Sequence, residues 1–244
     1  MGVRRVSKAA ADIVIVHSSD LHVDDGYTAR AWGGDGTGPL RQVLQAARAA
    51  AADVVLLAGD TFEHNRLPVA LIDRAAALLL EAGIPTVILP GNHDPAVPDS
   101  VFHRGRIAAP PHVHVLGVTH ETAVQFSELD LEIWGHAHRD YDDMAPLRRP
   151  RARSTRWQVA AAHGHYERVA DRTAPLRPSW LIGDADLAAT GADYVALGHW
   201  NTPKRVGQPD MRAYYSGSPD LAGTINVVRL AADGRVIVRR RRLG

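Results

Sequence analysis

The chain has 244 residues, of which 45% are hydrophobic and 23% charged, a composition typical of a soluble globular protein with a buried core. Its formal net charge of +1 excludes a strong overall attraction for nucleic acid, so any such attraction has to be local. It contains no cysteine, which excludes disulfides, thiolate metal sites and a cysteine nucleophile, and leaves carboxylate, imidazole and amide groups as strong metal ligands.

The N-terminal segment shares one feature with export signals, because arginines precede an apolar run. Asp12 interrupts that run, the stretch "IVIV" is too short for a signal peptide, and no cleavage site of small residues follows. No segment approaches the roughly 18 apolar residues that are needed to span a bilayer. We therefore expect a cytoplasmic protein with no membrane partner, in which residues 1–11 form a flexible N-terminus.

Strands and helices alternate in the first half of the chain. The second predicted helix begins at Pro68 and ends at Gly83, as helices often do. Uninterrupted apolar strands that alternate with helices indicate a mainly parallel sheet covered on both faces, and such sheets bind ligands at the carboxyl ends of their strands. The predicted strands are 12–19, 53–60 and 85–92, and the predicted helices are 40–52 and 68–83.

The second half is richer in strands. Two of them, 123–128 and 129–135, are predicted to pair as a hairpin, and Asp233 and Gly234 mark a second hairpin near the C-terminus. The charged segment 148–156 is interpreted as an exposed loop rather than a domain boundary. The other predicted strands are 112–117, 156–163, 193–199, 212–219, 224–230 and 235–241, with a helical segment at 180–191.

Five predicted strands end in residues that can bind a metal ion. A single aspartate or histidine at a strand end is more often a cap or turn residue, but five such ends in one chain favour a shared metal site. In an extended segment the residues i and i+2 point the same way, so the first two ligands could reach one ion together. Glycines at positions 59, 91 and 198 would let the backbone turn just before a ligand. The residues are Asp20, His22, Asp60, Asn92, His93, His163 and His199.

In this order the residues resemble the motif set of the calcineurin-like metallophosphoesterases. The motifs are "DLH", "GD", "GNHD", a later histidine at position 163, and "GHWN", and together they span residues 20–201. The flanking segments "GDTFEHNRLP" and "DYVALGHW…YYSGSP" are similar to the double-strand-break-repair exonucleases of that superfamily. The resemblance implies one α/β domain over residues 1–244, built as a four-layer α-β-β-α sandwich with mixed sheets and ending in a basic tail at residues 239–244.

The resemblance also implies a centre of two divalent ions. Asp20, His22 and Asp60 would hold the first ion, whereas Asp60, Asn92, His163 and His199 would hold the second, with Asp60 bridging the two. A shared carboxylate offsets part of the repulsion between the cations, and two carboxylates against four positive charges leave a cationic site that suits a phosphate ester. Mixed nitrogen and oxygen ligands favour manganese, with iron or zinc as alternatives.

The implied activity is hydrolysis of a phosphate ester by attack of a metal-bridging hydroxide. The expected enzyme is a phosphodiesterase, and its more specific activity could be that of a DNA exonuclease or another nuclease. His93 would protonate the leaving group or stabilise the transition state, and Asp94 could orient that imidazole by accepting a hydrogen bond. A protein or small-molecule phosphatase is the alternative within the enzymes.

One position departs from the family pattern. Asn201 stands where the last histidine is expected to serve the first ion, and its amide is a neutral, weaker ligand. This departure also allows a degenerate member that binds phosphate or a protein partner without turnover. His136 and His138 in "GHAH" are interpreted as loop or rim residues that could instead compensate for Asn201.

The remaining polar candidates have ordinary interpretations. Glu63 and His64 follow Asp60 at the mouth of the predicted site, where they could touch a substrate but are interpreted as loop residues. Arginine clusters at residues 4–8, 148–156 and 239–242 could contact a nucleic-acid partner, or could simply keep an arginine-rich surface solvated.

Overall fold

The computed structural model describes residues 11–141, 145–147, 149–173 and 180–244. The basic cluster at residues 4–8, most of the predicted flexible N-terminus and Arg148 lie outside these ranges. In the part of the chain that is described, each helix is too short or too polar to cross a bilayer.

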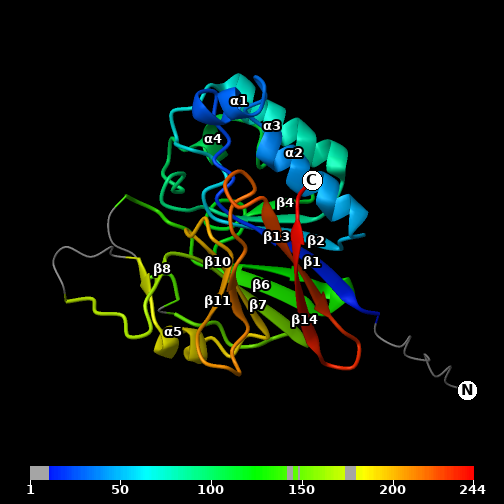
Figure 1. Ribbon diagram of the computed structural model, residues 1–244, viewed down its shortest axis with the longest axis vertical. Coiled ribbons are helices and arrows are strands. Elements are labelled where there is room, and N and C mark those ends of the chain that lie inside the picture. The colour runs from blue at the N-terminus through cyan, green and yellow to red at the C-terminus, as the bar shows by residue number, and fades with distance from the viewer. Residues whose placement is uncertain (1–10, 142–144, 148, 174–179) are drawn as a thin grey trace, which may run out of the picture.

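Two six-stranded sheets form the centre of the molecule (Figure 1). In each sheet the central strands are parallel; the first sheet has antiparallel strands at one edge, and the second has them at both. The first sheet has the order β14 (Val236–Arg242), β13 (Thr224–Leu230), β1 (Ile13–Ser18), β2 (Val54–Ala58), β3 (Thr86–Leu89), β4 (Val113–Val115). The second has the order β11 (Lys204–Val206), β12 (Ala213–Tyr215), β10 (Tyr194–Gly198), β7 (Trp157–His163), β6 (Leu131–Gly135), β5 (Ala123–Phe126).

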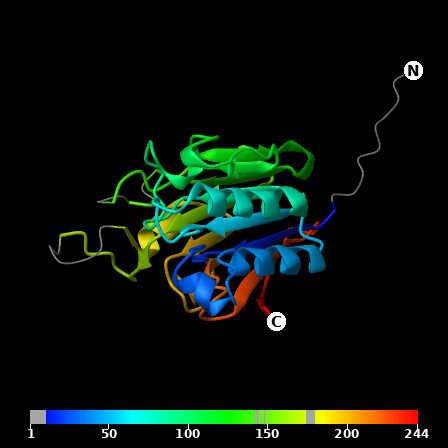
Figure 2. The ribbon, with the colours of Figure 1, turned by 90° about the horizontal axis from the view of Figure 1, so that it is seen from above.

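Helices cover the outer face of the first sheet. They are α1 (Tyr27–Ala31), α2 (Gly38–Ala49), α3 (Val69–Ala82) and α4 (Val101–Arg104), which lie together on one side of the molecule (Figures 1 and 2). The outer face of the second sheet packs against a shorter layer, α5 (Asp184–Ala189) with the strand pair β8 (His165–Tyr166) and β9 (Leu181–Ile182). The predicted α/β fold with mixed sheets is therefore confirmed, and its fourth layer is thin.

The hydrophobic pattern explains how the layers pack. All five residues of β2 are buried, and they alternate between a core shared with the helices and a core between the two sheets. Leu57 belongs to the first core, whereas Leu56 belongs to the second. Helix α3 follows Pro68 and ends at Gly83 in the left-handed conformation, as the sequence predicts.

Several predicted strands and turns match the structure in type, but their extent differs. The hairpins β5–β6 and β13–β14 are both present. Residues 239–242 belong both to the expected basic tail and, up to residue 241, to the strand predicted at 235–241. They form the last part of β14, because they pair with residues 224–227 of β13. The short elements α1, α4, β8 and β11, and the 3₁₀ turn at Ser127–Leu129, have no counterpart in the predicted elements.

Candidate metal centre

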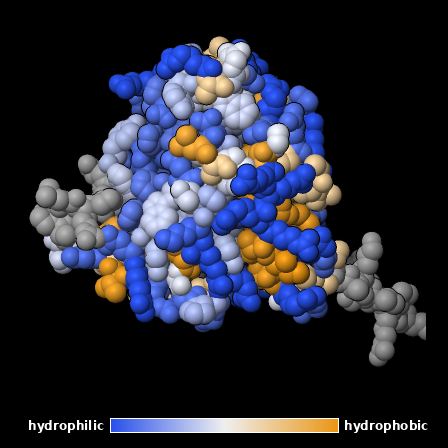
Figure 3. Space-filling model, viewed as in Figure 1, coloured by the Kyte–Doolittle hydropathy of each residue, from blue (hydrophilic) through white to orange (hydrophobic). Residues whose placement is uncertain are grey.

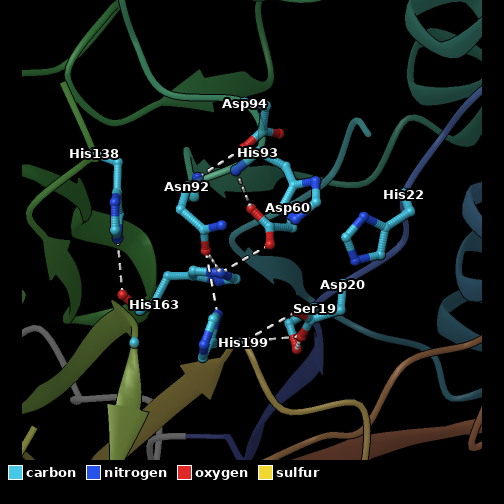
Figure 4. A network of polar contacts seen from close by, with 12 residues as sticks. Ser19, Asp20, His22, Asp60, Asn92, His93, Asp94, His138, His163 and His199 are labelled. Atoms are coloured by element: carbon cyan, nitrogen blue, oxygen red, sulfur yellow. Dashed lines mark hydrogen bonds and ion pairs between the residues drawn. The ribbon is translucent and has the colours of Figure 1, made fainter. Parts of the chain in front are cut away.

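The parallel strands of both sheets end at one edge, and their polar residues meet there (Figure 4). Asp60, which follows β2, lies at the centre of the group. One of its carboxylate oxygens is 3.0 Å from His163 Nε2, and the other accepts a hydrogen bond from the backbone N–H of His93 at 2.9 Å. Asp60 is 1% exposed, so these contacts form in a buried site with little solvent screening.

The side predicted to hold the second ion is closely packed. The Asn92 side-chain oxygen is 3.0 Å from His163 Nε2 and 3.2 Å from His199 Nδ1. His163 Nδ1 is 2.9 Å from the backbone oxygen of Ala58, and this contact directs Nε2 toward Asp60 and Asn92. Asp60, His163 and His199 each offer a ligand atom within 4.8 Å of the others.

The side predicted to hold the first ion is less closely connected. Asp20, His22 and Asp60 form a second group whose ligand atoms lie within 4.8 Å of one another. Asp20 is 2% exposed, and its carboxylate accepts hydrogen bonds from Ser19 Oγ at 2.5 Å and from the His199 backbone N–H at 3.0 Å. The side chain of His22 is 26% exposed.

Asp20 and His22 are brought together by a turn. Both have positive φ, 55° and 48°, so the extended geometry expected for this segment is wrong. The turn is held by the backbone N–H groups of Leu21 and His22, which donate to the Asp60 carbonyl. Asp60 and His199 also have positive φ, 51° and 101°, so strained backbone is concentrated at the predicted ligands.

Two glycines make room for the ligands. Gly59 has a φ of 96°, and a Cβ atom there would lie 2.0 Å from His163 Nδ1. A Cβ atom on Gly91 would lie 2.2 Å from an Asp60 carboxylate oxygen, although the φ of Gly91 is not positive. Gly59 thus allows both a left-handed turn of the backbone and the close approach of the His163 ring, whereas Gly91 allows only the close approach of the Asp60 carboxylate.

His93 lies at the mouth of the site, where its contacts differ from the prediction. Its Nδ1 atom is 2.9 Å from the Glu63 carbonyl oxygen and 3.5 Å from the Glu63 carboxylate. Asp94, expected to orient this imidazole, is fully buried and accepts hydrogen bonds from the backbone N–H groups of Gly91 and Phe62. Asp94 therefore fixes the loop, while Glu63 contacts the histidine.

The sequence places Glu63 at the mouth of the site and favours a loop residue, but it does not predict the contacts that Glu63 makes with two histidines. Its carboxylate is 2.8 Å from His22 Nδ1, so it touches a predicted ligand as well as His93. The rings of His22 and His93 meet edge to face at 4.9 Å between centroids. The only available signal was its position three residues after Asp60 in a loop that follows a ligand.

Charge and burial shift several protonation equilibria in the centre. The Glu63 carboxylate is the main cause that raises the pKa of His93 to about 9. Burial acts to lower the pKa of His163, but the negative charge of Asp60 outweighs it and raises that pKa to about 9. Burial, together with the charge of Asp60, raises the pKa of Asp94 to about 7. The negative charge of Asp60, the residue common to the groups predicted for the two ions, thus raises the pKa of both His163 and Asp94.

Three other predicted candidates are not brought into the cluster. Asn201 is exposed, and its backbone carbonyl accepts a hydrogen bond from the Ser218 N–H. His136 Nε2 is 2.9 Å from the Arg149 carbonyl oxygen. His138 is 1% exposed, and its Nε2 is 2.9 Å from the backbone oxygen of His163, so it contacts a ligand residue through the main chain.

The donors fit divalent transition metals. Carboxylate, imidazole and amide groups are the ligands that manganese, iron and zinc accept, and two groups that share Asp60 match a pair of ions. The buried carboxylates also require a compensating positive charge, which His163 supplies only in part.

Comparison with known proteins identifies a family. A family model described as calcineurin-like phosphoesterase matches residues 13–203. The comparison with curated proteins gives no match.

Solved structures show the same fold. The crystal structure of TT1561 of Thermus thermophilus is similar with a TM-score of 0.62 and 13% sequence identity, covering 95% of this chain and 99% of that chain. Another crystal structure has a TM-score of 0.60 and 12% identity, covering 96% of this chain and 100% of that chain. At such low identity the similarity establishes the architecture, and the repair-exonuclease branch remains a prediction.

Proposed function

The chain belongs to the calcineurin-like phosphoesterase family, and from this premise we propose that it is a dinuclear metal-dependent phosphodiesterase that prefers manganese. The observation that carries the proposal is the place of Asp60. It is the only residue common to the groups Asp20–His22–Asp60 and Asp60–His163–His199, as a bridging carboxylate has to be.

The chain's own residues have separable tasks in this proposal. Asp20 and His22 would hold one cation, Asn92, His163 and His199 the other, and Asp60 both. When bound, the pair of cations would supply an acidified water and positive charge for the phosphate group. The buried carboxylates and imidazoles fix the positions of these charges before substrate arrives, which lowers the reorganisation that the reaction requires.

His93 is proposed as the proton donor to the leaving oxygen. Its Nδ1 atom faces the Glu63 carbonyl, which leaves Nε2 on the other edge of the ring available to a substrate. In the metal-free protein the Glu63 carboxylate raises the pKa of His93 to about 9, which favours the protonated imidazole. The side chain is 40% exposed, so a substrate can reach it.

Nuclease activity on DNA is the second candidate, and the arginines of β14 favour it. Residues 239–242 are exposed, and Figure 3 shows hydrophilic groups around an apolar patch on the face that carries β13 and β14. Within the described ranges none of these four guanidinium groups pairs with a carboxylate, in contrast to Arg229 and Arg235. Arg240 pairs with Asn226, which pairs with His17 near the carboxyl end of β1, so the run lies toward the metal edge.

Hydrolysis assays test both levels of the proposal. The purified protein should hydrolyse bis-p-nitrophenyl phosphate with added Mn²⁺ and should lose this activity after chelation. Linear single- and double-stranded DNA, compared with a phosphomonoester, distinguishes a nuclease from a phosphatase. Activity confined to monoesters would refute the phosphodiesterase and nuclease assignments. No turnover with manganese, iron or zinc would favour a non-catalytic binding protein.

A further inference from the structure

The carboxylate of Glu63 contacts two histidines of the metal centre. One oxygen is 2.8 Å from His22 Nδ1, and the other is 3.5 Å from His93 Nδ1. The rings of the two histidines also touch each other, edge to face. Glu63 therefore joins a predicted ligand of the first ion to the predicted proton donor.

The contact with His22 favours one ring nitrogen for an ion: Nδ1 lies 2.8 Å from a Glu63 oxygen without the alignment of a hydrogen bond, so charge attraction carries the contact. Nδ1 and Nε2 lie on opposite edges of an imidazole, so a histidine whose Nδ1 faces a carboxylate presents Nε2 to a metal. A carboxylate behind a ligating histidine fixes the orientation of the ring and makes it a stronger ligand. His22 belongs to the group with Asp20 and Asp60 and also to a group with Glu63 and His93, so it lies between the predicted ion site and Glu63.

The first ion site has a specific need for such support. The second site has two imidazoles, from His163 and His199, whereas the first has His22 alone. Asn201 stands at the position where the family pattern has a histidine, and it is exposed, with its backbone carbonyl bonded to Ser218. The first site is therefore the poorer in basic ligands.

The side chain of Glu63 is not needed to hold its own loop. The Glu63 N–H donates to the Val23 carbonyl at 3.1 Å, and the Val23 N–H donates to the Thr61 carbonyl at 2.9 Å. Phe62, next to Glu63, is fully buried and bridges to Val23 in the manner of a parallel strand. Main-chain contacts and Phe62 thus fix the loop, which leaves the carboxylate free for another task.

We propose that Glu63 is a positioning residue for the first cation: it holds His22 as a strong ligand, compensates for Asn201, and couples that ligand to His93. The inference rests on the proposed function, because it concerns the same metal centre. The ordinary alternative is that Glu63 and His22 form a partly exposed ion pair that has little effect on metal binding.

Metal titration of the whole protein separates these alternatives. Mn²⁺ binding to the chelator-stripped protein, followed by calorimetry and by electron paramagnetic resonance of the ion pair, reports each ion without using activity. We expect Glu63→Gln to weaken one of the two binding steps by about 10- to 100-fold, the range for partners of metal ligands, and to leave the other step unchanged. His64→Ala, one residue along the same loop, and Asn201→Ala should leave both steps as in the wild type.

Further variants keep the test decisive. Thermal melting checks that Glu63→Gln is folded, and Glu63→Asp, which keeps the charge on a shorter side chain, should regain part of the lost affinity. The inference is overturned if Glu63→Gln binds Mn²⁺ as the wild type does, or if Glu63→Asp loses as much Mn²⁺ affinity as Glu63→Gln. It is also overturned if Asn201→Ala no longer binds the first ion. A wild-type protein that binds no pair of ions would refute the proposed function itself, whereas a pair that is insensitive to Glu63 refutes only this inference.

Discussion

The two halves of the candidate metal centre differ in how completely the protein prepares them. On the second-ion side Asp60, Asn92, His163 and His199 contact one another directly, and His163 is fully buried. On the first-ion side Asp20 is buried, but His22 is 26% exposed and Asn201 lies at the surface. Each half thus combines buried side chains with a partly exposed histidine, and the halves differ in how closely their candidate ligands contact one another.

This difference follows from where the ligands come from. The second-ion side is formed by the ends of β2, β3, β7 and β10, four neighbouring strands of the two packed sheets. The first-ion side depends on the turn after β1, which backbone hydrogen bonds to the loop after β2 hold in place. Because the candidate ligands of the second ion contact one another more closely, we expect the second ion to bind more tightly and the first to exchange more readily.

The largest effect is expected at the residue that both halves share. Asp60→Ala should abolish binding of the metal pair and lower phosphodiesterase activity by at least roughly 10³-fold, because both ions lose their common ligand and His163 loses its charge partner. Calorimetric titration with Mn²⁺ and hydrolysis of bis-p-nitrophenyl phosphate measure the two effects.

Asp99→Ala is the matched control, since Asp99 is an exposed aspartate of the same chain and lies in neither candidate group. It should behave as the wild type. If Asp60→Ala still bound two ions, the two halves would not share a ligand and the comparison between them would lose its basis.

The next effect concerns a residue that serves the reaction without holding an ion. His93→Ala should lower the rate by roughly 10²- to 10⁴-fold, the range for a lost proton donor, while both Mn²⁺ binding steps stay close to those of the wild type. The reason is that His93 contacts Glu63 through Nδ1 and is held by its backbone N–H on Asp60. Single-turnover hydrolysis and metal titration on the same preparation provide the measurement, and an empty metal site in this variant would show that His93 is a ligand.

Much of this arrangement could be predicted from the sequence. The apolar runs of β1, β2 and β3 are buried strands, and the structure brings together Asp20, His22 and Asp60 because parallel strands end at one edge. These predictions depend on local hydrophobic pattern and on a general property of parallel sheets, so they need no knowledge of distant contacts.

Side-chain direction could not be predicted in the same way. Asp94 is next to His93 in the sequence, yet its carboxylate turns inward to the amides of Gly91 and Phe62. Glu63 reaches His22 across 41 positions of the chain, a contact that depends on how two loops pack. In a loop the backbone has no regular repeat, so the side chains of neighbouring residues can point in unrelated directions.

A variant at position 201 would sharpen the contrast between the halves. Asn201→His places an imidazole at the position where the family pattern has one, but Asn201 is exposed and lies outside the cluster, so we expect both binding steps to stay as in the wild type. Asn201→Gln keeps an amide and serves as the control. A first binding step that tightens by roughly tenfold in the histidine variant, the low end of what one ligand-shell group contributes, would mean that residue 201 reaches the ion.

The last prediction concerns a histidine beneath the site, whose replacement should change the stability of the fold rather than activity. His17 on β1 is fully buried with Nδ1 2.8 Å from the Tyr194 hydroxyl, and burial lowers its pKa from 6.5 to about 3. Between these values the unfolded chain binds a proton that the folded chain excludes, so the contribution of His17 to stability is lost as the pH falls below 6.5.

From pH 7 to pH 5 this loss is about 2 kcal/mol, at 1.4 kcal/mol for each pH unit below 6.5. Urea unfolding of the metal-free protein measures this loss as a decrease in the free energy of unfolding between pH 7 and pH 5. The decrease should be smaller by this amount in His17→Gln than in the wild type. In His103→Gln, which changes an exposed histidine, the free energy of unfolding should decrease as it does in the wild type. Equal decreases in wild type and His17→Gln would mean that the buried imidazole takes up its proton within the fold.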